Sequence, residues 1–554
     1  MALASALCAV TLLPLLLQVH AAPSGDEVLT LPGWDQPLPS RIYSGFIDAG
    51  SDTQDNVTYT VKMWYMLVQA EVADPLSAPL ILWSNGGPGA SSAFGMFTEM
   101  GPFYLSSESL QYSPPKLFRN NYSWTKQANI LILNGPAPVG YSYCLPAGPA
   151  GNGRSCGSWN DTRTFEFNFN FVNNFFAAFP EYKKNPFSIV GESYAGVYTG
   201  MLVSGLLNAS TELNLFGLGL IDTCMGTDVL CGGGYKAGPW LGLLFNAGQG
   251  CISLATFEAI LAQCPMEILK TGPISALPAD CQALLATADA ECPGNAFYGY
   301  NYLDQCPPDP FSAGRSGRGG DTPPPPAQPS GYPCGGDGAL TKWITLPETK
   351  AALHIPADAN YWSFDNGEGF VYNLTWATNL PLLRRLQTGK DGVRVLIING
   401  ETDPSISSFK SQAVSFALDF PLQEAWRPWT FGEGGPTVVA GQVVQWQGNI
   451  THVTIRGSGH MVPGFVSAVL VHLSAFGVNC PSPLSPPAHT HRPHRHTFFP
   501  SIFTLPPCPP VPAQKPYSAY LMLQNFLASE PVWPKLPPAG KKALLPGEKE
   551  EVYL

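Results

Sequence analysis

The chain has 554 residues, of which 56 are glycine and 56 are proline, and its formal net charge is −11. Only 12% of the residues are charged, whereas the 30 Phe, 21 Tyr and 13 Trp can bury a large core, which excludes a wholly disordered chain. The 29 Lys and Arg residues are scattered, and binding to nucleic-acid phosphates needs clustered cations, so we do not expect a nucleic-acid binder.

The N-terminus has the pattern of a secretory signal peptide over residues 1–22. The apolar stretch Val10–Leu17 is followed by small residues at Ala21 and Ala22, where a signal peptidase would cut. The alternative is a buried N-terminal helix. No later stretch reaches the roughly 18 uninterrupted apolar residues that a membrane span needs, so we expect no span in the mature chain. Six glycosylation sequons also favour the secretory pathway: Asn56, Asn121, Asn160, Asn208, Asn373 and Asn449.

Thirteen cysteines indicate an oxidising compartment. Cys8 lies in the signal peptide, and eight of the other twelve lie between Cys224 and Cys334, so we expect disulfides to concentrate in that middle region. The cysteine spacings are irregular and no paired C-x2-C motif occurs, which argues against a zinc site. We expect neither a metal nor a cofactor.

Apolar strands alternate with helical segments along much of the chain. Such alternation favours a mainly parallel sheet covered on both faces by helices, which is an α/β fold. We expect strands at 57–68, 79–83, 129–133, 187–190, 393–398 and 452–455, a helix with an aromatic face at 165–179, and a small-residue helix after residue 190.

The α/β pattern is interrupted twice, which divides the chain into segments. Residues 226–340 are rich in Gly and Cys and are interpreted as a cap insertion, and their 305–335 stretch is a proline-rich loop. Residues 464–512 form a second low-complexity insertion. The core is therefore expected in two parts, 23–225 and 341–463, followed by a C-terminal helix and tail at 513–554.

The segment Gly191-Glu192-Ser193-Tyr194-Ala195-Gly196 directly follows an apolar strand. Small residues around Ser193 permit the sharp strand-to-helix turn that exposes a nucleophile above a sheet. The second glycine stands one place late for the strict motif, and such residues also mark ordinary helix starts. Ser193 is the candidate nucleophile.

A serine nucleophile needs a base, and the base needs an orienting carboxylate. Outside the signal peptide and the low-complexity stretch, the candidates are His354, His452 and His460. His452 should pack on the sheet within a strand, whereas His460 follows that strand in a glycine-rich loop, and we choose His460. Both Glu401 and Asp403 follow a strand between the serine and the histidine, so spacing alone leaves the two open.

Three motifs resemble the serine carboxypeptidase family, which implies an α/β-hydrolase fold with an inserted cap. They are Trp83–Ser92 (WSNGGPGASS), Gly191–Gly196 (GESYAG) and Gly459–Pro463 (GHMVP). The similarity runs from about residue 33 to residue 533, with gaps at the two low-complexity stretches.

The resemblance implies roles for individual residues. Ser193, Asp403 and His460 match the catalytic triad, and the backbone N–H groups of Gly87 and Tyr194 match the oxyanion hole. The substrate's terminal carboxylate would be held by Asn85, Gly86, Glu99 and Glu192, and Trp83 and Met461 would line the substrate pocket.

Two adjacent carboxyl groups cannot both ionise at low cost, so Glu99 and Glu192 should share a proton. A protonated Glu can donate a hydrogen bond to a carboxylate, whereas an ionised one would repel it. This pair predicts an acidic optimum for peptide cleavage.

The sequence departs from the family pattern at several positions. Ala90 stands where the family has a cysteine, whose partner would match Cys334. Asp222-Thr223-Cys224 stands where Gly-Asn is usual, and Cys224 and Cys231 become a candidate local disulfide. Joining Pro463 to Ala513 restores a family-like ending, so our hypothesis is that 464–512 is a retained intron, with a genuine surface loop as the rival.

The sequence therefore predicts a serine-type carboxypeptidase that acts on peptide or protein C-termini, in the secretory pathway and either secreted or vacuolar/lysosomal. The alternatives are an acyltransferase or esterase of the same fold and a catalytically impaired binding or protective homologue. A homodimer is compatible with this interpretation.

Overall fold

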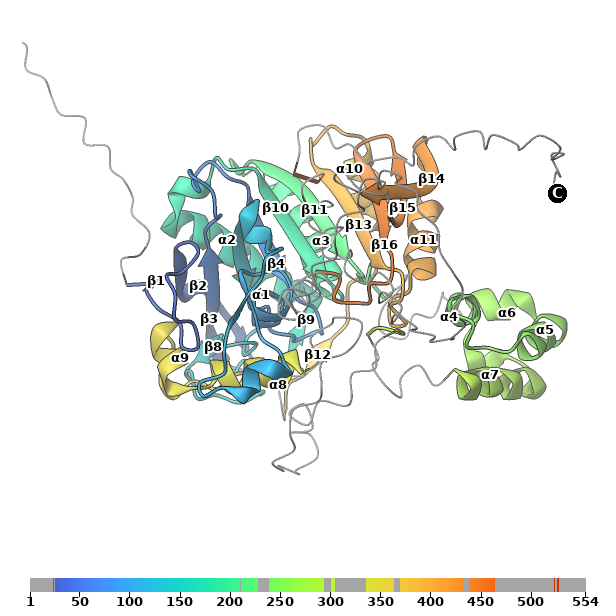
Figure 1. Ribbon diagram of the computed structural model, residues 1–554, viewed down its shortest axis with the longest axis horizontal. Helices are drawn as coiled ribbons and strands as arrows, with labels where there is room; N and C mark the ends of the chain where they lie inside the picture. Colours follow the sequence, from blue (N-terminus) through green and yellow to red (C-terminus); the bar gives the residue numbers. More distant parts are fainter. Residues whose placement is uncertain are drawn as a thin grey trace, which may run out of the picture.

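The computed structural model describes residues 23, 25–209, 211–227, 239–292, 300–303, 335–362, 369–431, 438–463, 523 and 526–527. Its centre is a twelve-stranded sheet with helices on both sides (Figure 1). Two further sheets have two strands each, β5 with β6 and β9 with β12. The strands of all three sheets are β1 (Glu27–Val28), β2 (Ile42–Gln54), β3 (Val57–Val68), β4 (Leu80–Ser84), β5 (Phe103–Tyr104), β6 (Phe118–Arg119), β7 (Asn129–Leu133), β8 (Tyr143–Leu145), β9 (Trp159–Asn160), β10 (Phe187–Glu192), β11 (Leu215–Ile221), β12 (Tyr372–Asn373), β13 (Arg394–Gly400), β14 (Leu422–Phe431), β15 (Val438–Trp446) and β16 (Ile450–Ile455).

The helices include α1 (Ala93–Thr98), α2 (Asp161–Ala178), α3 (Ala195–Asn208), α4 (Trp240–Gly248), α5 (Leu254–Gln263), α6 (Met266–Thr271), α7 (Ala279–Glu291), α8 (Gly336–Ile344), α9 (Pro347–Ala352), α10 (Leu380–Gln387) and α11 (Ser408–Ala417). Short 3₁₀ turns are η1 (Ser107–Gln111), η2 (Trp124–Lys126), η3 (Pro180–Tyr182) and η4 (Ile274–Ala276).

The middle of the large sheet is parallel. Its strand order is β1-β2-β3-β7-β4-β10-β11-β13-β16-β15-β14, with β8 paired to β3, and the neighbours from β7 to β16 all run parallel. The flanking strands are antiparallel, so the whole sheet is mixed. The expected parallel centre and the α/β class are confirmed, whereas the long antiparallel flanks were not anticipated.

The parallel strands are continuous apolar runs because both of their faces are buried. In β4, Leu80 and Leu82 join the core on one side of the sheet, while Ile81 and Trp83 join the core on the other. The first core is completed by α2, α3 and α10, and the second by α1 and α8. This two-sided packing fixes the strand ends from which the functional loops emerge.

The predicted strands all occur, and the predicted aromatic helix begins earlier than expected. Helix α2 starts at Asp161 because the Asn160 side chain accepts the backbone N–H of Arg163 at 2.9 Å, which caps the helix. In the sequence Asn160 stands out only as a sequon, and the apolar pattern that predicts this helix begins later, at Phe165.

The range 226–340, which we predicted to be a cap insertion, contains a small helical unit formed by α4, α5, α6 and α7, which lies beside the end of the sheet near α11 (Figure 1). It has its own apolar cluster and two disulfides, Cys251–Cys292 and Cys264–Cys281. A third disulfide, Cys144–Cys156, ties down the loop after β8. Within the described ranges, no helix is both long enough and apolar enough to cross a membrane.

Candidate active site

Loops at the carboxyl ends of three parallel strands carry the predicted triad. Ser193 follows β10, Asp403 follows β13 and His460 follows β16. Ligand sites of parallel α/β sheets lie at this edge, because loops from neighbouring strands meet there.

Ser193 occupies a sharp turn between β10 and α3. Its φ of 59° lies in the left-handed region, and its backbone N–H donates to Ile221 O at 3.0 Å. The glycines around it allow close approach: a Cβ on Gly191 would lie 2.5 Å from Ala195 O, and one on Gly196 would lie 2.5 Å from Cys224 O. The Ser193 side chain stays half-buried rather than enclosed, as an attacking nucleophile requires.

The structure resolves which acid meets His460. His460 Nδ1 lies 2.6 Å from Asp403 Oδ2, and both side chains are buried. The other Asp403 oxygen accepts the Ser405 N–H at 2.7 Å, which fixes the carboxylate. Glu401 instead accepts the backbone N–H of Gly457 at 2.9 Å through its side chain. Asp403 can therefore orient the His460 ring so that Nε2 is the free base.

The other two candidate histidines have structural partners. His452 is fully buried between Ser415 Oγ at 2.9 Å and Asn399 Oδ1 at 3.0 Å, and burial lowers its pKa to about 3. It stays neutral inside the sheet. The exposed His354 faces the carbonyl of Ser44 at 3.2 Å through Nδ1.

A short cap segment, Tyr300–Leu303, binds both triad loops, and sequence reasoning missed it. The Tyr300 ring stacks on the His460 ring with centroids 5.1 Å apart, and Tyr300 O accepts the His460 N–H at 2.7 Å. Asn301 Oδ1 accepts the Thr402 hydroxyl at 2.6 Å, and Tyr302 N–H donates to Thr402 O at 2.8 Å. These contacts join the cap to the residue beside Asp403. In the sequence, the only feature that could have indicated these contacts is the polar Asn301 between two tyrosines.

The Asn85–Gly89 turn abuts the nucleophile turn. A Cβ on Gly86 would lie 2.3 Å from the backbone nitrogen of Tyr194, so only glycine fits there. Gly87 has a φ of 110°, which again favours glycine. The backbone of Gly86 thus packs against the N-terminus of α3 at Tyr194, and an oxyanion hole formed by Gly87 and Tyr194 stays a prediction. The Tyr194 side chain is anchored elsewhere, because its hydroxyl donates to Asp161 at 2.7 Å.

A buried cluster of two carboxyls and one amide lies beside these turns. Asn85 Nδ2 donates to Glu192 Oε1 at 2.9 Å and to Glu99 Oε1 at 3.2 Å, and all three side chains are almost fully buried. Asn85 therefore brings the two carboxyl groups together, and each carboxyl affects the pKa of the other. Burial raises the pKa of Glu99 to about 7, and burial together with the Glu99 charge raises the pKa of Glu192 well above its usual range. Such a pair holds a proton at acidic pH and can donate it to an anion.

Trp83 supports this cluster from below. Its side chain is fully buried, its Nε1–H donates to Asn85 Oδ1 at 2.8 Å, and its ring packs edge-on against Trp124. Met461 is also buried in the core next to His460. Trp83 thus fixes the Asn85 amide, and direct contact of Trp83 or Met461 with substrate stays a prediction.

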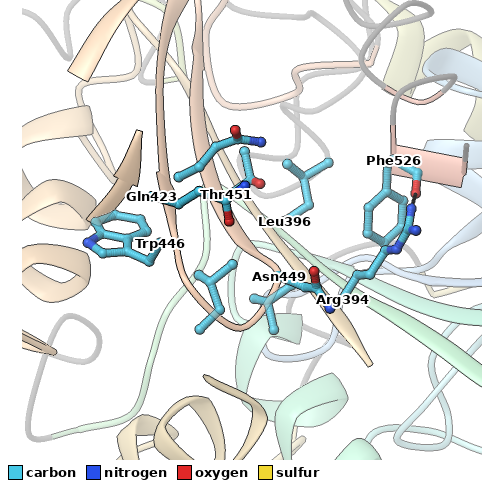
Figure 2. Close-up of a pocket in the computed structure, with 10 residues that line it drawn as sticks. Arg394, Leu396, Gln423, Trp446, Asn449, Thr451 and Phe526 are labelled. Atoms are coloured by element: carbon cyan, nitrogen blue, oxygen red, sulfur yellow. Dashed lines mark hydrogen bonds between the residues drawn. The ribbon is translucent and has the colours of Figure 1, made fainter. Parts of the chain in front are cut away.

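A separate pocket lies at the opposite end of the sheet. It is lined at the starts of β13 and β16 by residues that include Arg394, Trp446 and Asn449, and Phe526 closes one side (Figure 2). The loops that carry Asp403 and His460 leave the other ends of these two strands, so this pocket is remote from the predicted triad.

Several predictions fall wholly or partly outside the described residues. Cys224 is disulfide-bonded, but Cys231 and Cys334 lie in undescribed ranges, so the predicted pairing stays a prediction. The signal peptide and residues 464–512 also lie outside the described residues. The sequon asparagines are exposed except Asn160, which is half-buried at its helix cap.

The serine carboxypeptidase family model matches residues 32–475. Mouse lysosomal protective protein is 30% identical over 479 residues, which cover 80% of this chain and 91% of that protein. Serine carboxypeptidase 1 of Hordeum vulgare is 28% identical over 504 residues, with 80% and 91% coverage.

Among solved structures, the prohormone-processing carboxypeptidase Kex1(delta)p from Saccharomyces cerevisiae aligns with a TM-score of 0.59 and 20% identity. The alignment covers 82% of this chain and 96% of that one, which shows a shared fold. With the matched family model spanning most of the sequence, the chain belongs to the serine carboxypeptidase family.

Proposed function

We propose that this enzyme releases C-terminal residues from peptides and proteins by acyl-enzyme hydrolysis, and that it does so best at acidic pH. The observation that carries this proposal is the Asn85–Glu99–Glu192 cluster beside the Ser193 turn. A buried carboxyl pair that keeps a proton can donate a hydrogen bond to a carboxylate, and this charge-assisted bond is stronger than one to a neutral ester or amide end.

The geometry supports a stepwise mechanism. Ser193 Oγ attacks the carbonyl carbon of the last peptide bond while its proton passes to His460 Nε2, and the carbonyl oxygen becomes an oxyanion facing the Gly87 and Tyr194 N–H groups. Collapse of this intermediate breaks the C–N bond, and His460 gives the proton to the leaving amine. Water then attacks the acyl-enzyme with His460 again as the base, which frees the shortened peptide and restores Ser193.

The direction of the pH dependence follows from the carboxyl pair. Below about pH 7 Glu99 holds its proton and can donate to the substrate carboxylate. Above that pH the pair gains negative charge and repels it. Peptide cleavage should therefore fall on the alkaline side.

The exposed sequons and the three described disulfides favour a route through the secretory pathway. The mouse relative is named a lysosomal protective protein, and an acidic compartment would suit the carboxyl pair. We include a lysosomal, vacuolar or secreted location in the proposal.

The decisive experiment uses the purified full chain with N-blocked dipeptides at pH 5 and pH 7.5, beside the Ser193→Ala variant. We expect release of the C-terminal amino acid at pH 5, weaker release at pH 7.5, and none above background for the variant. Release that survives Ser193→Ala would overturn the mechanism. Transfer of the acyl group to an added alcohol, with no hydrolysis of dipeptides, would instead assign the site to acyl transfer.

A further inference from the structure

A third buried acid lies behind the predicted triad, and the mechanism above does not use it. Asp222 follows β11, the strand between those that carry Ser193 and Asp403, and its side chain is fully buried. Its φ of 41° lies in the left-handed region, which Asp and Asn tolerate better than other residues with side chains. The sequence resemblance places a neutral Asn in this region of the family, so this chain introduces an ionisable group there.

The end of β13 holds Asp222 firmly in place. Asn399 Nδ2 donates to Asp222 Oδ1 at 2.7 Å, and the Gly400 N–H lies 3.1 Å from Oδ1 and 3.0 Å from Oδ2. The backbone N–H of Asp222 in turn donates to Ile398 O at 2.8 Å. Asp222 is therefore anchored to Gly400, which precedes Asp403 by three residues. The N–H groups of Asn399 and Gly400 that bond to its side chain are suited to a carboxylate.

Asp222 comes close to both members of the Asp403–His460 pair. One side-chain oxygen from each acid and one ring nitrogen of His460 all lie within 4.8 Å of one another. Two unit charges at such a separation in a buried site change an equilibrium by more than tenfold, even at an effective dielectric constant of about 20. We propose that Asp222 acts beside Asp403 as a second carboxyl group of the His460 site, and that its ionised form stabilises the imidazolium that forms on His460 during catalysis.

The groups around Asp222 determine when its charge is present. Asp403 faces it from the loop after β13, His460 from the loop after β16, and Glu192 acts on it from the end of β10. His452 contacts Asn399, which in turn bonds to Asp222, and His452 stays neutral. Lys410 of α11 interacts with Asp403.

Burial and the Asp403 charge raise the pKa of Asp222 well above its usual range, against the pull of the N–H donors. Asp222 is thus neutral in acid and gains its charge as the pH rises. An Asn at this position would mimic the neutral form at every pH, because its Oδ1 can keep the contacts to Asn399 and Gly400.

This difference fixes the direction in which the ratio of wild-type to Asp222→Asn rate constants changes with pH. At low pH the wild-type chain and Asp222→Asn should react alike, because Asp222 is protonated. At high pH only the wild type has the charge that stabilises the imidazolium in the transition state. The ratio of the two rate constants should therefore rise from about one to tenfold or more. A merely structural role would give a ratio that does not change with pH.

The test uses an alkyl fluorophosphonate on the purified full chain between pH 4.5 and pH 9. Ser193 Oγ forms a bond to phosphorus, fluoride leaves, and the Ser193 proton passes to His460. The second-order labelling rate therefore measures proton transfer to His460 without a peptide substrate. Glu192 is present in both proteins, so its own titration largely cancels from the ratio. A ratio that stays constant across this range would overturn the proposal.

Two controls accompany the measurement. Asp391→Asn removes a carboxylate that pairs with Arg385 and lies just before the start of β13, away from the triad loops. The ratio of the wild-type labelling rate to the rate of this variant should stay near one at every pH. If Asp222→Asn does not fold, Asp222→Ser replaces it. The ratio of the wild-type labelling rate to the Asp222→Ser rate should then rise with pH, and a ratio that stays constant would contradict the inference.

The inference rests on the proposed serine-hydrolase mechanism but not on the peptide substrate. If dipeptides are not cleaved while the labelling ratio still rises with pH, only the proposed substrate fails. If dipeptides are cleaved while the ratio stays flat, only the role of Asp222 fails.

Discussion

Replacing both glutamates of the carboxylate cluster should remove the alkaline limit on peptide cleavage. In the Glu99→Gln/Glu192→Gln variant the amides keep hydrogen-bond donors at every pH and cannot become anionic. Changing both residues is necessary because the Glu99 charge contributes to the raised pKa of Glu192, so a single change would leave a partner that ionises more readily.

The size of the effect follows from the pKa of about 7 for Glu99. At pH 9, two pH units higher, only about 1% of Glu99 keeps its proton, so wild-type kcat/KM should fall roughly 100-fold from its acidic plateau. The double variant should lose activity on the plateau through imperfect geometry. Its kcat/KM should nevertheless stay within about threefold of its own plateau up to pH 9.

The assay compares kcat/KM from pH 4.5 to pH 9 for an N-blocked dipeptide and for the corresponding N-blocked amino-acid methyl ester. The ester leaving group lacks a carboxylate, so its wild-type profile should show no fall near pH 7. An unchanged alkaline limb for the dipeptide in the double variant would refute the reasoning, and so would the same limb for the ester.

Three further outcomes follow from the same structure. Because folding raises the pKa of Glu99, its contribution to stability is full below about pH 4.5 and is lost as the pH rises through about 7. The free energy of unfolding of Glu99→Gln should therefore exceed that of the wild type by about 3 kcal/mol at pH 8.5 and equal it at pH 4. Chemical denaturation at the two pH values measures this difference. The pKa of His452 is lowered to about 3, so stability should fall by about 1.4 kcal/mol for each pH unit below about 6.5, and His452→Gln should flatten that slope in the same assay. Tyr300→Leu removes the ring stacked on His460 and should lower kcat about tenfold with little change in KM, whereas Tyr300→Phe should keep kcat within about twofold, and equal losses in both variants would exclude a role for the stacked ring.

The sequence was sufficient for the parts of the fold and site that local patterns encode. Apolar runs identified every parallel strand from β7 to β16 except β11, whose Leu215–Ile221 segment is interrupted by glycines. Strand-then-turn patterns placed Ser193, Asp403 and His460 after their strands. The antiparallel flanks escaped prediction because β14 and β15 are only partly apolar and depend on pairing with each other and with β16.

What the sequence left open depends on contacts between distant segments. Glu401 and Asp403 were equal on spacing, and the structure separates them through the 2.6 Å contact to His460 and the bond from Gly457 to Glu401. Tyr300 is 160 residues from His460 in the chain, so no local pattern could reveal their stacking. The sequence marks Asp222 only as a departure from the family pattern, because its closeness to His460 results from the order of β11, β13 and β16.

The most direct test of the central claim is the release of a C-terminal amino acid at pH 5, measured by mass spectrometry, from one peptide with a free carboxylate and from the same peptide with a C-terminal amide. The wild type should release the last residue of the free acid at least tenfold faster than it cleaves the amide, and Ser193→Ala should lower that rate by about 10⁴-fold or more. Equal rates on the two peptides, or undiminished release by Ser193→Ala, would contradict the proposed serine carboxypeptidase mechanism.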